Sequence, residues 1–437
     1  MTAGERIQLH IDDLTGSGDG VARTDRGVVF VPGALPGETC TAEIRRVGSG
    51  AAFARLLSAD VPSPARCAPD CPLAGRCGGC AFRHTDYATE LDAKARQVQA
   101  CLARIGHVDL APERVLGAPS RDGWRNKAML HARDGALGFC EAESHLPAEG
   151  PCPALEASGE ADRIRRTVAA HYAREGGALS GLLLRISHAT PDLSVCLVTD
   201  RPVPSPDKLT DALRAAVPRI SGISLCPPPR RGSEGLGQGA RPLWGDPRIR
   251  DTLCGLSFSI DPAAFFQVNT PMAETLYRTA AEFADLRPGE TLIDLYCGIG
   301  SIGLSMASLS PGIRLFGGEI VPEAVDCARE NARCNHIPGE FFTGDAKKVF
   351  ADLLARGIRA DCVVVDPPRK GLSPDLPGLL ASMAPRRIVY VSCDPATLAR
   401  DVARLAPDYA PTRLAVCDLF PGTGHVETVV LMSRDKE

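Results

Sequence analysis

The 437-residue sequence contains no apolar run that approaches the length of a membrane span. Its first residues, Met1 to Leu14, carry charges and lack the apolar core of a signal peptide. The formal net charge of −4 shows no global excess of basic residues, so any surface for nucleic acid must be a local patch. We find no internal repeat. These absences argue against a membrane protein, a secreted protein and a repeat protein, and we expect a cytoplasmic location.

Apolar residues make up 44% of the chain and charged residues 23%, which is typical of soluble globular proteins. The length is too great for one ordinary core and predicts two to three domains. Cysteine is abundant, with 17 residues. In a large chain without a secretory signal, cysteines indicate reduced thiols, metal ligands or catalytic groups rather than disulfides.

Residues 6–60 have an all-β pattern. Short β-prone segments at 7–11, 27–31 and 38–44 are separated by turns that contain Gly, Asp or Pro. About five such strands would form a small OB-like barrel, a shape often used to bind oligonucleotides. A barrel that only packs against its neighbour is the alternative.

Four cysteines follow within fourteen residues, with Gly and Pro between them: Cys67, Cys71, Cys77 and Cys80. Core packing explains such a cluster poorly, whereas small residues let the backbone fold tightly around an ion or a cluster. Zinc sites usually show two paired Cys-x-x-Cys units. Here Cys71, Cys77 and Cys80 form a group of three that needs a fourth ligand, either the local Cys67 or the distant Cys152. An iron–sulfur cluster tolerates a distant fourth thiolate.

Helical and extended patterns alternate in the central region. A helix is expected over 86–106, and 124–139 resembles a hairpin in which Arg125 and Lys127 are candidates for phosphate contacts or simply solvated charges. The segment 161–260 reads as α+β, and 227–241 as an exposed connection rich in Gly, Pro and Arg.

From about residue 287, strands alternate with helices, which predicts a parallel sheet. A glycine-rich turn at 297–303 follows a strand, and such a turn lets a nucleoside approach the backbone closely. Asp294, Glu319 and Asp345 lie at the ends of three successive strands. Glu319 is placed to accept ribose hydroxyls and Asp345 to meet an adenine edge. The pattern suits a nucleoside without phosphates, such as S-adenosylmethionine, although helix capping is an alternative role for the carboxylates.

The apolar strand 387–392 turns at Cys393 into a helix, with Asp394 as the expected N-cap and Pro395 as the first helical residue. A thiol just before a helix N-terminus lies near the positive end of the helix dipole, which favours the thiolate. A buried, unreactive cysteine is the alternative for this residue taken alone.

Two carboxylates are expected beside this thiol. The strand 362–365 runs into Asp366 and two prolines, which fix a rigid exit at the carboxyl edge of the sheet. Glu427 begins the last strand, and it reaches the same edge if that strand is antiparallel to 387–392. A cysteine, carboxylates and a methyl-donor pocket then converge.

With these residues in place, the chain resembles the S-adenosylmethionine-dependent RNA (uracil-5-)-methyltransferase family, in the branch with an N-terminal TRAM domain and a 4Fe–4S cluster that methylates 23S ribosomal RNA. The resemblance spans nearly the whole chain. It rests on the barrel and on the motifs at 71–80, 265–269, 294–298, 366–371, 392–401 and 425–427.

The resemblance implies a multi-domain protein. Residues 1–60 form the TRAM, OB-like β-barrel, and 61–260 an α+β central domain with the iron–sulfur cysteines. Residues 261–437 form an α/β, Rossmann-like methyltransferase domain, on which 86–120 are a candidate to pack. A monomer with no membrane contact is expected.

The resemblance also implies a set of site residues. The cluster ligands are Cys71, Cys77, Cys80 and Cys152, which leaves Cys67 outside. The cofactor-binding residues are Gln267, Tyr296, Ser301, Glu319, Asp345 and Asp366, with Asp366 also at the target base.

Carbon 5 of uracil is a poor nucleophile until a thiolate adds to carbon 6 and turns the ring into an enolate. Cys393 is the candidate thiolate, and Glu427 is the candidate base that removes the carbon 5 proton after methyl transfer. Because the target base must leave its stack, an unpaired loop of a folded RNA is the expected substrate. The reaction moves no net electrons, so the cluster is expected to be structural or to contact RNA.

Three other functions would require different residues. An exocyclic-amine methyltransferase would place an aromatic residue where Arg369 stands and would need no Cys393, and a cytosine-5 DNA enzyme would carry its cysteine after the strand 362–365. A non-catalytic iron–sulfur RNA-binding protein would not depend on Cys393 or Glu427. Within the family, tRNA enzymes generally lack the barrel and the cysteines, which favours ribosomal RNA over tRNA.

Overall fold

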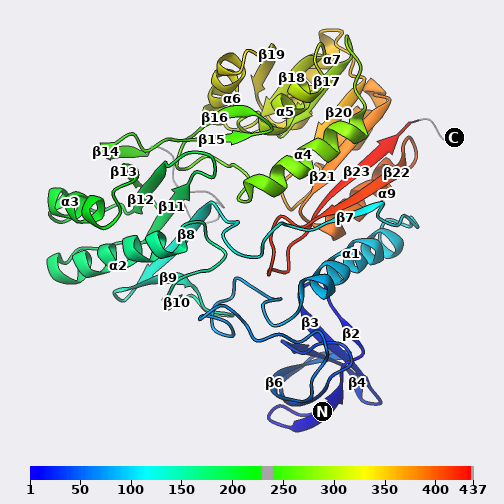
Figure 1. Cartoon of the computed structure of the whole chain (residues 1–437). Helices are drawn as coiled ribbons and strands as arrows, with labels where there is room; N and C mark the ends of the chain where they lie inside the picture. The colour runs from blue at the N-terminus through cyan, green and yellow to red at the C-terminus, as the bar shows by residue number, and fades with distance from the viewer. Residues whose placement is uncertain (229–239, 435–437) are drawn as a thin grey trace.

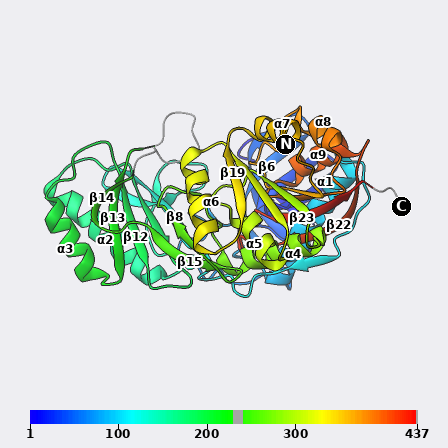
Figure 2. The same cartoon turned by 90° about the horizontal axis from the view of Figure 1, so that it is seen from above.

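The computed structural model describes residues 1–228 and 240–434. The chain forms three units: a small barrel with the N-terminus, a central sheet with two helices, and a large C-terminal sheet with helices on both faces (Figure 1). Seen from above, the central sheet lies beside the other two units and the molecule is elongated (Figure 2). Most of the connection expected at 227–241 lies outside the described residues.

The barrel is a six-stranded sheet of order β1-β5-β6-β4-β3-β2. Its first and last strands are consecutive in the chain, and β1 also contacts β3, so the sheet curves around a buried core that includes Ile11, Val29 and Ile44. The OB-like barrel predicted from the sequence is confirmed. Its strands are β1 (Arg6–His10), β2 (Asp13–Leu14), β3 (Asp19–Thr24), β4 (Gly27–Pro32), β5 (Thr39–Val47) and β6 (Ala51–Val61).

The central sheet has seven strands in the order β10-β9-β8-β11-β12-β13-β14. Helices α2 and α3 pack against it, and every residue of β11 and β12 is buried, so both faces of these strands are covered. The elements are β8 (Lys127–Arg133), β9 (Ala136–Cys140), β10 (Pro147–Ala148), α2 (Ser158–Glu175), β11 (Gly181–Ile186), β12 (Leu193–Val198), α3 (Pro206–Ala216), β13 (Ile220–Cys226) and β14 (Arg241–Gly245).

The third sheet has eight strands in the order β19-β18-β17-β20-β21-β23-β22-β7. The first five are parallel, so their carboxyl ends meet at one edge, and β23 is inserted antiparallel between β21 and β22. The predicted parallel sheet and inserted last strand are confirmed. The strands are β7 (Arg114–Leu116), β17 (Thr291–Leu295), β18 (Arg314–Glu319), β19 (Gly339–Thr343), β20 (Cys362–Val365), β21 (Arg387–Ser392), β22 (Ala410–Cys417) and β23 (Glu427–Ser433).

Helices cover both faces of this sheet (Figure 1). One core contains residues of α4 (Thr270–Ala284), α5 (Ser301–Leu309), α6 (Pro322–Cys334) and the hairpin of β15 (Ile249–Leu253) and β16 (Leu256–Ile260). The other core contains residues of α1 (Tyr87–Arg104), α7 (Ala346–Ala355), α8 (Leu376–Met383) and α9 (Pro395–Leu405).

Two elements reach this unit from earlier parts of the chain. Helix α1 packs on α9, and β7 pairs in parallel with β22 as the last strand of the sheet. The segment 86–120 therefore lies against the C-terminal unit, and the hairpin β15–β16 shares its core although it precedes residue 261. Of the helices in the described ranges, none has the length and apolar character needed to cross a bilayer.

Candidate active site

The turn after β17 brings backbone close to the carboxyl edge of the sheet. Tyr296, Gly298 and Gly300 all adopt positive φ, at 65°, 53° and 84°, and Gly300 leads directly into α5. A Cβ on Gly303 would lie 2.8 Å from Oδ2 of Asp294. Glycine at 303 is therefore needed for close packing of α5 on β17.

Glu319 ends β18 at this edge and stabilises the turn. Its Oε2 accepts a hydrogen bond from the Gly298 amide at 3.1 Å, and its Oε1 accepts one from the Val321 amide at 2.9 Å. The carboxylate is half-buried, so its remaining lone pairs can face a ligand that lies over the turn.

The other two carboxylates of the predicted set differ from Glu319. Asp345 is exposed and caps α7 by accepting from the Lys348 amide at 2.9 Å, which is compatible with a second contact to a ligand. Asp294 lies near the same edge, because the charges of Asp366 and Glu319 act on it, but its carboxylate is not exposed. Asp294 is fully buried within β17, accepts from the Gly303 amide at 2.9 Å, and has a pKa raised to about 8 by burial.

Of the remaining predicted cofactor residues, Tyr296 and Ser301 belong to this turn, whereas Gln267 lies before α4. Ser301 is the first residue of α5, and its hydroxyl is 3.0 Å from the hydroxyl of the buried Tyr277. Gln267 is buried just before α4, and its carbonyl accepts from Asn126 Nδ2 at 2.9 Å. Tyr296 is half-buried at the start of the turn.

Two exposed apolar side chains near this edge were not predicted. Ile320, which follows Glu319, is 65% exposed, and so is Phe265, two residues before Gln267. Large apolar side chains exposed next to polar ligand-binding candidates are typical of a surface that a ligand covers. The only sequence signal for them was their position beside the predicted residues.

Cys393 lies where β21 ends and α9 begins. As predicted, Asp394 is the N-cap of α9, with its Oδ1 accepting from the Ala396 amide at 3.0 Å and from the Thr397 amide at 2.9 Å, and Pro395 is the first helical residue. The effect predicted for the helix is outweighed by neighbours that the segment itself does not show. The Asp394 carboxylate occupies the positive end of α9, while burial, Glu427 and Asp366 raise the pKa of Cys393 to about 12.

Glu427 begins β23 directly beside this thiol. Ser392 is registered with Thr428 across the antiparallel pair, so Cys393 and Glu427 are the next residues on the two strands. Glu427 is 4% exposed, and its Oε2 has no hydrogen-bond partner in the described part of the chain. Burial and then the charge of Asp366 raise its pKa well above the ordinary value.

Asp366, which follows β20, completes the group of acids. Burial raises its pKa to about 7. Arg369, three residues later, lowers the pKa of both Cys393 and Glu427, and its Nη2 is 3.3 Å from Nδ1 of His425. Sequence reasoning placed Cys393, Glu427 and Asp366 together but missed the opposing charge of Arg369, for which the motif at 366–371 was the available signal.

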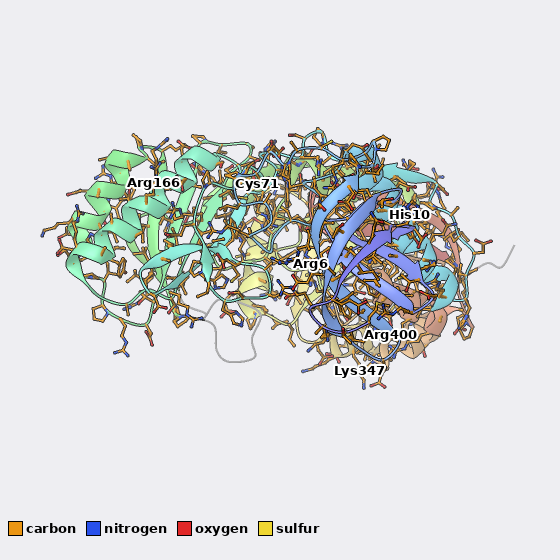
Figure 3. All side chains as sticks on the ribbon, turned by 90° about the horizontal axis from the view of Figure 1, so that it is seen from below. Arg6, His10, Cys71, Arg166, Lys347 and Arg400 are labelled. Atoms are coloured by element: carbon orange, nitrogen blue, oxygen red, sulfur yellow. The ribbon has the colours of Figure 1, made fainter. Side chains whose placement is uncertain are left out.

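The predicted cysteine group lines a cavity of about 500 Å³ that Thr423 and His425, shortly before Glu427 in the chain, also line. Cys71, Cys77, Cys80 and Cys152 all line it, whereas Cys67 is exposed and does not. Cys71 lies between the central unit, marked by Arg166, and the barrel, marked by His10 (Figure 3). Across residues 1–228 and 240–434, no three His, Cys, Asp or Glu side chains are grouped as a site for a metal ion.

The two candidate phosphate contacts differ in their surroundings. Arg125 lines the cysteine cavity, with its guanidinium 4.8 Å from the centre of the Trp124 ring. Lys127 is half-buried beside Arg185 on the next strand, and burial followed by the Arg185 charge lowers its pKa to about 7. Lys127 is therefore a poor candidate for a solvated phosphate contact.

The electrostatic coupling in this site is testable without substrate. Replacing Asp366 with Asn removes a negative charge that disfavours the Cys393 thiolate, so the pKa of Cys393 falls. The alkylation rate of Cys393 by iodoacetamide at pH 9 should rise severalfold, because each pKa unit changes the thiolate fraction by about tenfold. Peptide mass spectrometry would follow Cys393 separately from the other cysteines. Asp345→Asn, at the far end of the site, serves as the control, and an equal increase in that variant would contradict the assignment.

Comparison with known proteins agrees with this geometry. The sequence model of the tRNA (uracil-5-)-methyltransferase family matches residues 255–435, and the TRAM domain model matches residues 2–57. An uncharacterized RNA methyltransferase of Halalkalibacterium halodurans is 37% identical over 98% of this chain and 96% of its own length. One from Clostridium tetani is 34% identical over 97% and 95% of the two chains.

A solved structure is similar over the same extent. The Pyrococcus abyssi tRNA (uracil-54, C5)-methyltransferase in complex with S-adenosyl-L-homocysteine superposes with a TM-score of 0.76. It is 28% identical, and the match covers 97% of this chain and 99% of that one. The barrel is thus a TRAM domain and the C-terminal unit a methyltransferase domain. The chain belongs to the family of S-adenosylmethionine-dependent RNA (uracil-5-)-methyltransferases.

Proposed function

We propose that this enzyme methylates carbon 5 of a specific uridine in RNA through a covalent adduct with Cys393. The observation that carries the proposal is the meeting of Cys393 and Glu427 at neighbouring positions of β21 and β23, with Asp366 from β20 at the same edge. A nucleophile and a base on adjacent strands are what addition to carbon 6 and proton removal from carbon 5 require.

S-adenosylmethionine would supply a methyl group on a sulfonium ion. The glycine turn offers it an approach to backbone, since a Cβ on Gly298 would meet nothing within 4 Å. We assign Glu319 to the ribose hydroxyls and Asp345 to the adenine edge, with Ile320 against the adenine ring. Gln267, Tyr296, Ser301 and Asp366 complete the proposed cofactor site.

The uridine is activated by Cys393. The thiol loses its proton and its sulfur bonds to carbon 6, which places electron density on carbon 5 for attack on the methyl group. Because burial and two carboxylates oppose the thiolate, Arg369 is the group of this site that favours it. Asp366 would accept a hydrogen bond from the uracil N3–H and hold the ring in the plane of attack.

Glu427 completes the reaction. Once carbon 5 carries the methyl group, Glu427 takes the carbon 5 proton, the C–H electron pair forms the 5,6 double bond, and the C6–S bond breaks. The buried, unpartnered Oε2 is the oxygen available for this proton. The raised pKa of Glu427 makes it a stronger base than an exposed carboxylate, and activity should increase as pH rises through that pKa.

Separate variants should stop the reaction at different steps. Cys393→Ala should abolish both methyl transfer and adduct formation. Glu427→Gln keeps the shape but cannot accept the proton, so it should accumulate a covalent, methylated RNA–protein adduct that survives SDS, with turnover reduced by about 100-fold or more. A tritium-labelled methyl donor and a denaturing gel measure both. Glu330→Gln, on the exposed face of α6, is the control. An active Cys393→Ala enzyme would exclude the covalent mechanism.

We also propose that Cys71, Cys77, Cys80 and Cys152 hold a 4Fe–4S cluster. Four cysteines line one cavity of about 500 Å³, which suits a group larger than a single ion. The cysteines of such a cluster bind four different irons, so they do not have to converge on one point as ligands of a single metal do. The role proposed for the cluster is structural or RNA-contacting.

Metal content tests this assignment. Anaerobically purified protein should contain about four irons per chain. Cys80→Ser should lose most of that iron, whereas Cys67→Ser, whose cysteine lies outside the cavity, should retain it. Stoichiometric zinc in place of iron would overturn the proposal.

For the target we propose a uridine of 23S ribosomal RNA, with the enzyme acting as a monomer. The cysteine group supports this choice, as the resemblance to the 23S rRNA branch implies. The barrel does not separate the two targets, because a match over 97% of this chain to a tRNA enzyme cannot leave out the TRAM domain. A tRNA uridine is the second candidate. It is favoured by the P. abyssi tRNA enzyme, which matches this chain along nearly its whole length.

Mapping 5-methyluridine in both RNAs separates the two targets. Cells that lack this protein should lose the modification at one position of 23S rRNA and keep it in tRNA. Re-expression of the wild-type chain should restore it, and Cys393→Ala should not. Loss from tRNA alone would establish the second candidate.

A further inference from the structure

The segment 418–426 joins β22 to β23 and ends directly before Glu427. It is more than a simple hairpin connection, because the barrel, the residues that follow Cys80 and α1 all contact it. The proposed base is therefore carried by a stretch of chain that the N-terminal half holds in place.

The strongest of these contacts is a buried cluster of ions. Lys94 Nζ lies 2.8 Å from Glu90 Oε1 on the same helix and 2.7 Å from Asp418 Oδ1 at the start of the segment. All three side chains are at most 1% exposed. Arg121 adds a second cation, with Nη2 3.1 Å from Glu90 Oε2, and the Tyr87 hydroxyl donates to Asp418 Oδ2 at 2.9 Å. The two acids and two bases balance in charge.

The cluster also binds the backbone of the segment. Lys94 Nζ donates to the Phe420 carbonyl at 3.3 Å, and the Gly422 amide donates to Glu90 Oε1 at 2.6 Å. The Phe420 amide donates to Asp418 Oδ1 at 3.2 Å. Buried charges tolerate displacement poorly, because a shift leaves them unpaired in an apolar environment. The cluster therefore fixes where residues 418–422 lie.

Further contacts hold the rest of the segment. The amides of Ala81 and Phe82, directly after Cys80, donate to the Gly422 carbonyl at 2.8 and 2.9 Å. A Cβ on Gly424 would lie 3.0 Å from the Cα of Ser17 in the barrel. A larger residue at 424 would therefore require a small local shift of the barrel backbone at Ser17.

The side chain of Glu427 is positioned mainly by its own backbone. Its Oε2 has no hydrogen-bond partner within the described ranges, so the position of its carboxylate follows from the backbone that leads into it. That backbone is fixed on one side by β21, where the Thr428 hydroxyl donates to the Ser392 carbonyl at 3.1 Å. On the other side it is paired with β22, where Glu427 is in register with Cys417, and the segment 418–426 connects these two residues at the end of the hairpin.

We propose that the buried Glu90–Lys94–Asp418 cluster is a positioning element for proton removal: it holds the segment 418–426 so that the Glu427 carboxylate faces carbon 5 of the methylated base. Lys94 and Tyr87 are then positioning residues that act through Glu427. The inference rests on the proposed covalent mechanism and deepens it.

The test measures the step at which the reaction stops. Tyr87→Phe removes the hydrogen bond to Asp418 and also the acceptor of the Ala118 amide, which donates to the Tyr87 hydroxyl at 2.6 Å. Lys94→Met removes the central charge of the cluster. With a uridine-containing RNA hairpin and a tritium-labelled methyl donor, both variants should form the methylated Cys393 adduct and release it slowly. The covalent fraction should rise severalfold and kcat should fall about tenfold, while KM for RNA changes less than about twofold.

A matched control is Tyr390→Phe, which also removes a buried tyrosine hydroxyl that donates to a buried aspartate, Asp401, at 2.9 Å. This variant should lose similar thermal stability without accumulating adduct. If Lys94→Met does not fold, Tyr87→Phe decides the question. A parallel loss of adduct and product in Tyr87→Phe, or equal accumulation in Tyr390→Phe, would overturn the proposal. If the wild-type enzyme neither methylates nor forms adduct in the same assay, the proposed function fails instead.

Discussion

The pairing of β23 with β21 is the constraint on which the site depends. An all-parallel sheet would place the start of the last strand at the opposite edge, far from the helix that follows β21. Because β23 runs antiparallel, its first residue and the residue after β21 are neighbours in the backbone register. The proposed base and the proposed nucleophile, 34 positions apart in sequence, therefore lie at neighbouring positions of the sheet.

The same constraint creates an electrostatic problem. Two acids and a thiol are brought together in a poorly solvated edge, where each disfavours the ionisation of the others. Arg369 lies among these groups, and its guanidinium contacts the His425 ring. Burial and the neighbouring acids therefore disfavour ionisation of Cys393 and Glu427, and Arg369 acts against this effect.

Local patterns in the sequence were sufficient to predict most of the fold. The short strands of the barrel, the alternation of strands and helices after residue 287 and the turn from β21 into α9 all depend on neighbouring residues. The convergence of Cys393, Glu427 and Asp366 followed from topology, since carboxyl ends of parallel strands share an edge.

What the sequence could not predict depends on burial and on distant contacts. Asp294 occupies the same kind of strand-end position as Glu319, and only the packing of α5 shows that it points into the core. The pKa of Cys393 depends on Glu427 and Asp366, which helix-dipole reasoning from its own segment leaves out. The Lys94–Asp418 pair joins residues 324 positions apart, and the sequence offered no periodic signal for it.

The three-residue strand β7 is an edge strand of the large sheet, although it precedes its partner β22 by almost 300 residues in the sequence. A C-terminal fragment that begins near residue 255 would contain every residue of the proposed reaction but would leave the amides and carbonyls of β22 open along one side. An exposed strand edge of this kind can pair with a strand of another molecule. In the whole chain, β7 covers this edge of β22 over three residues.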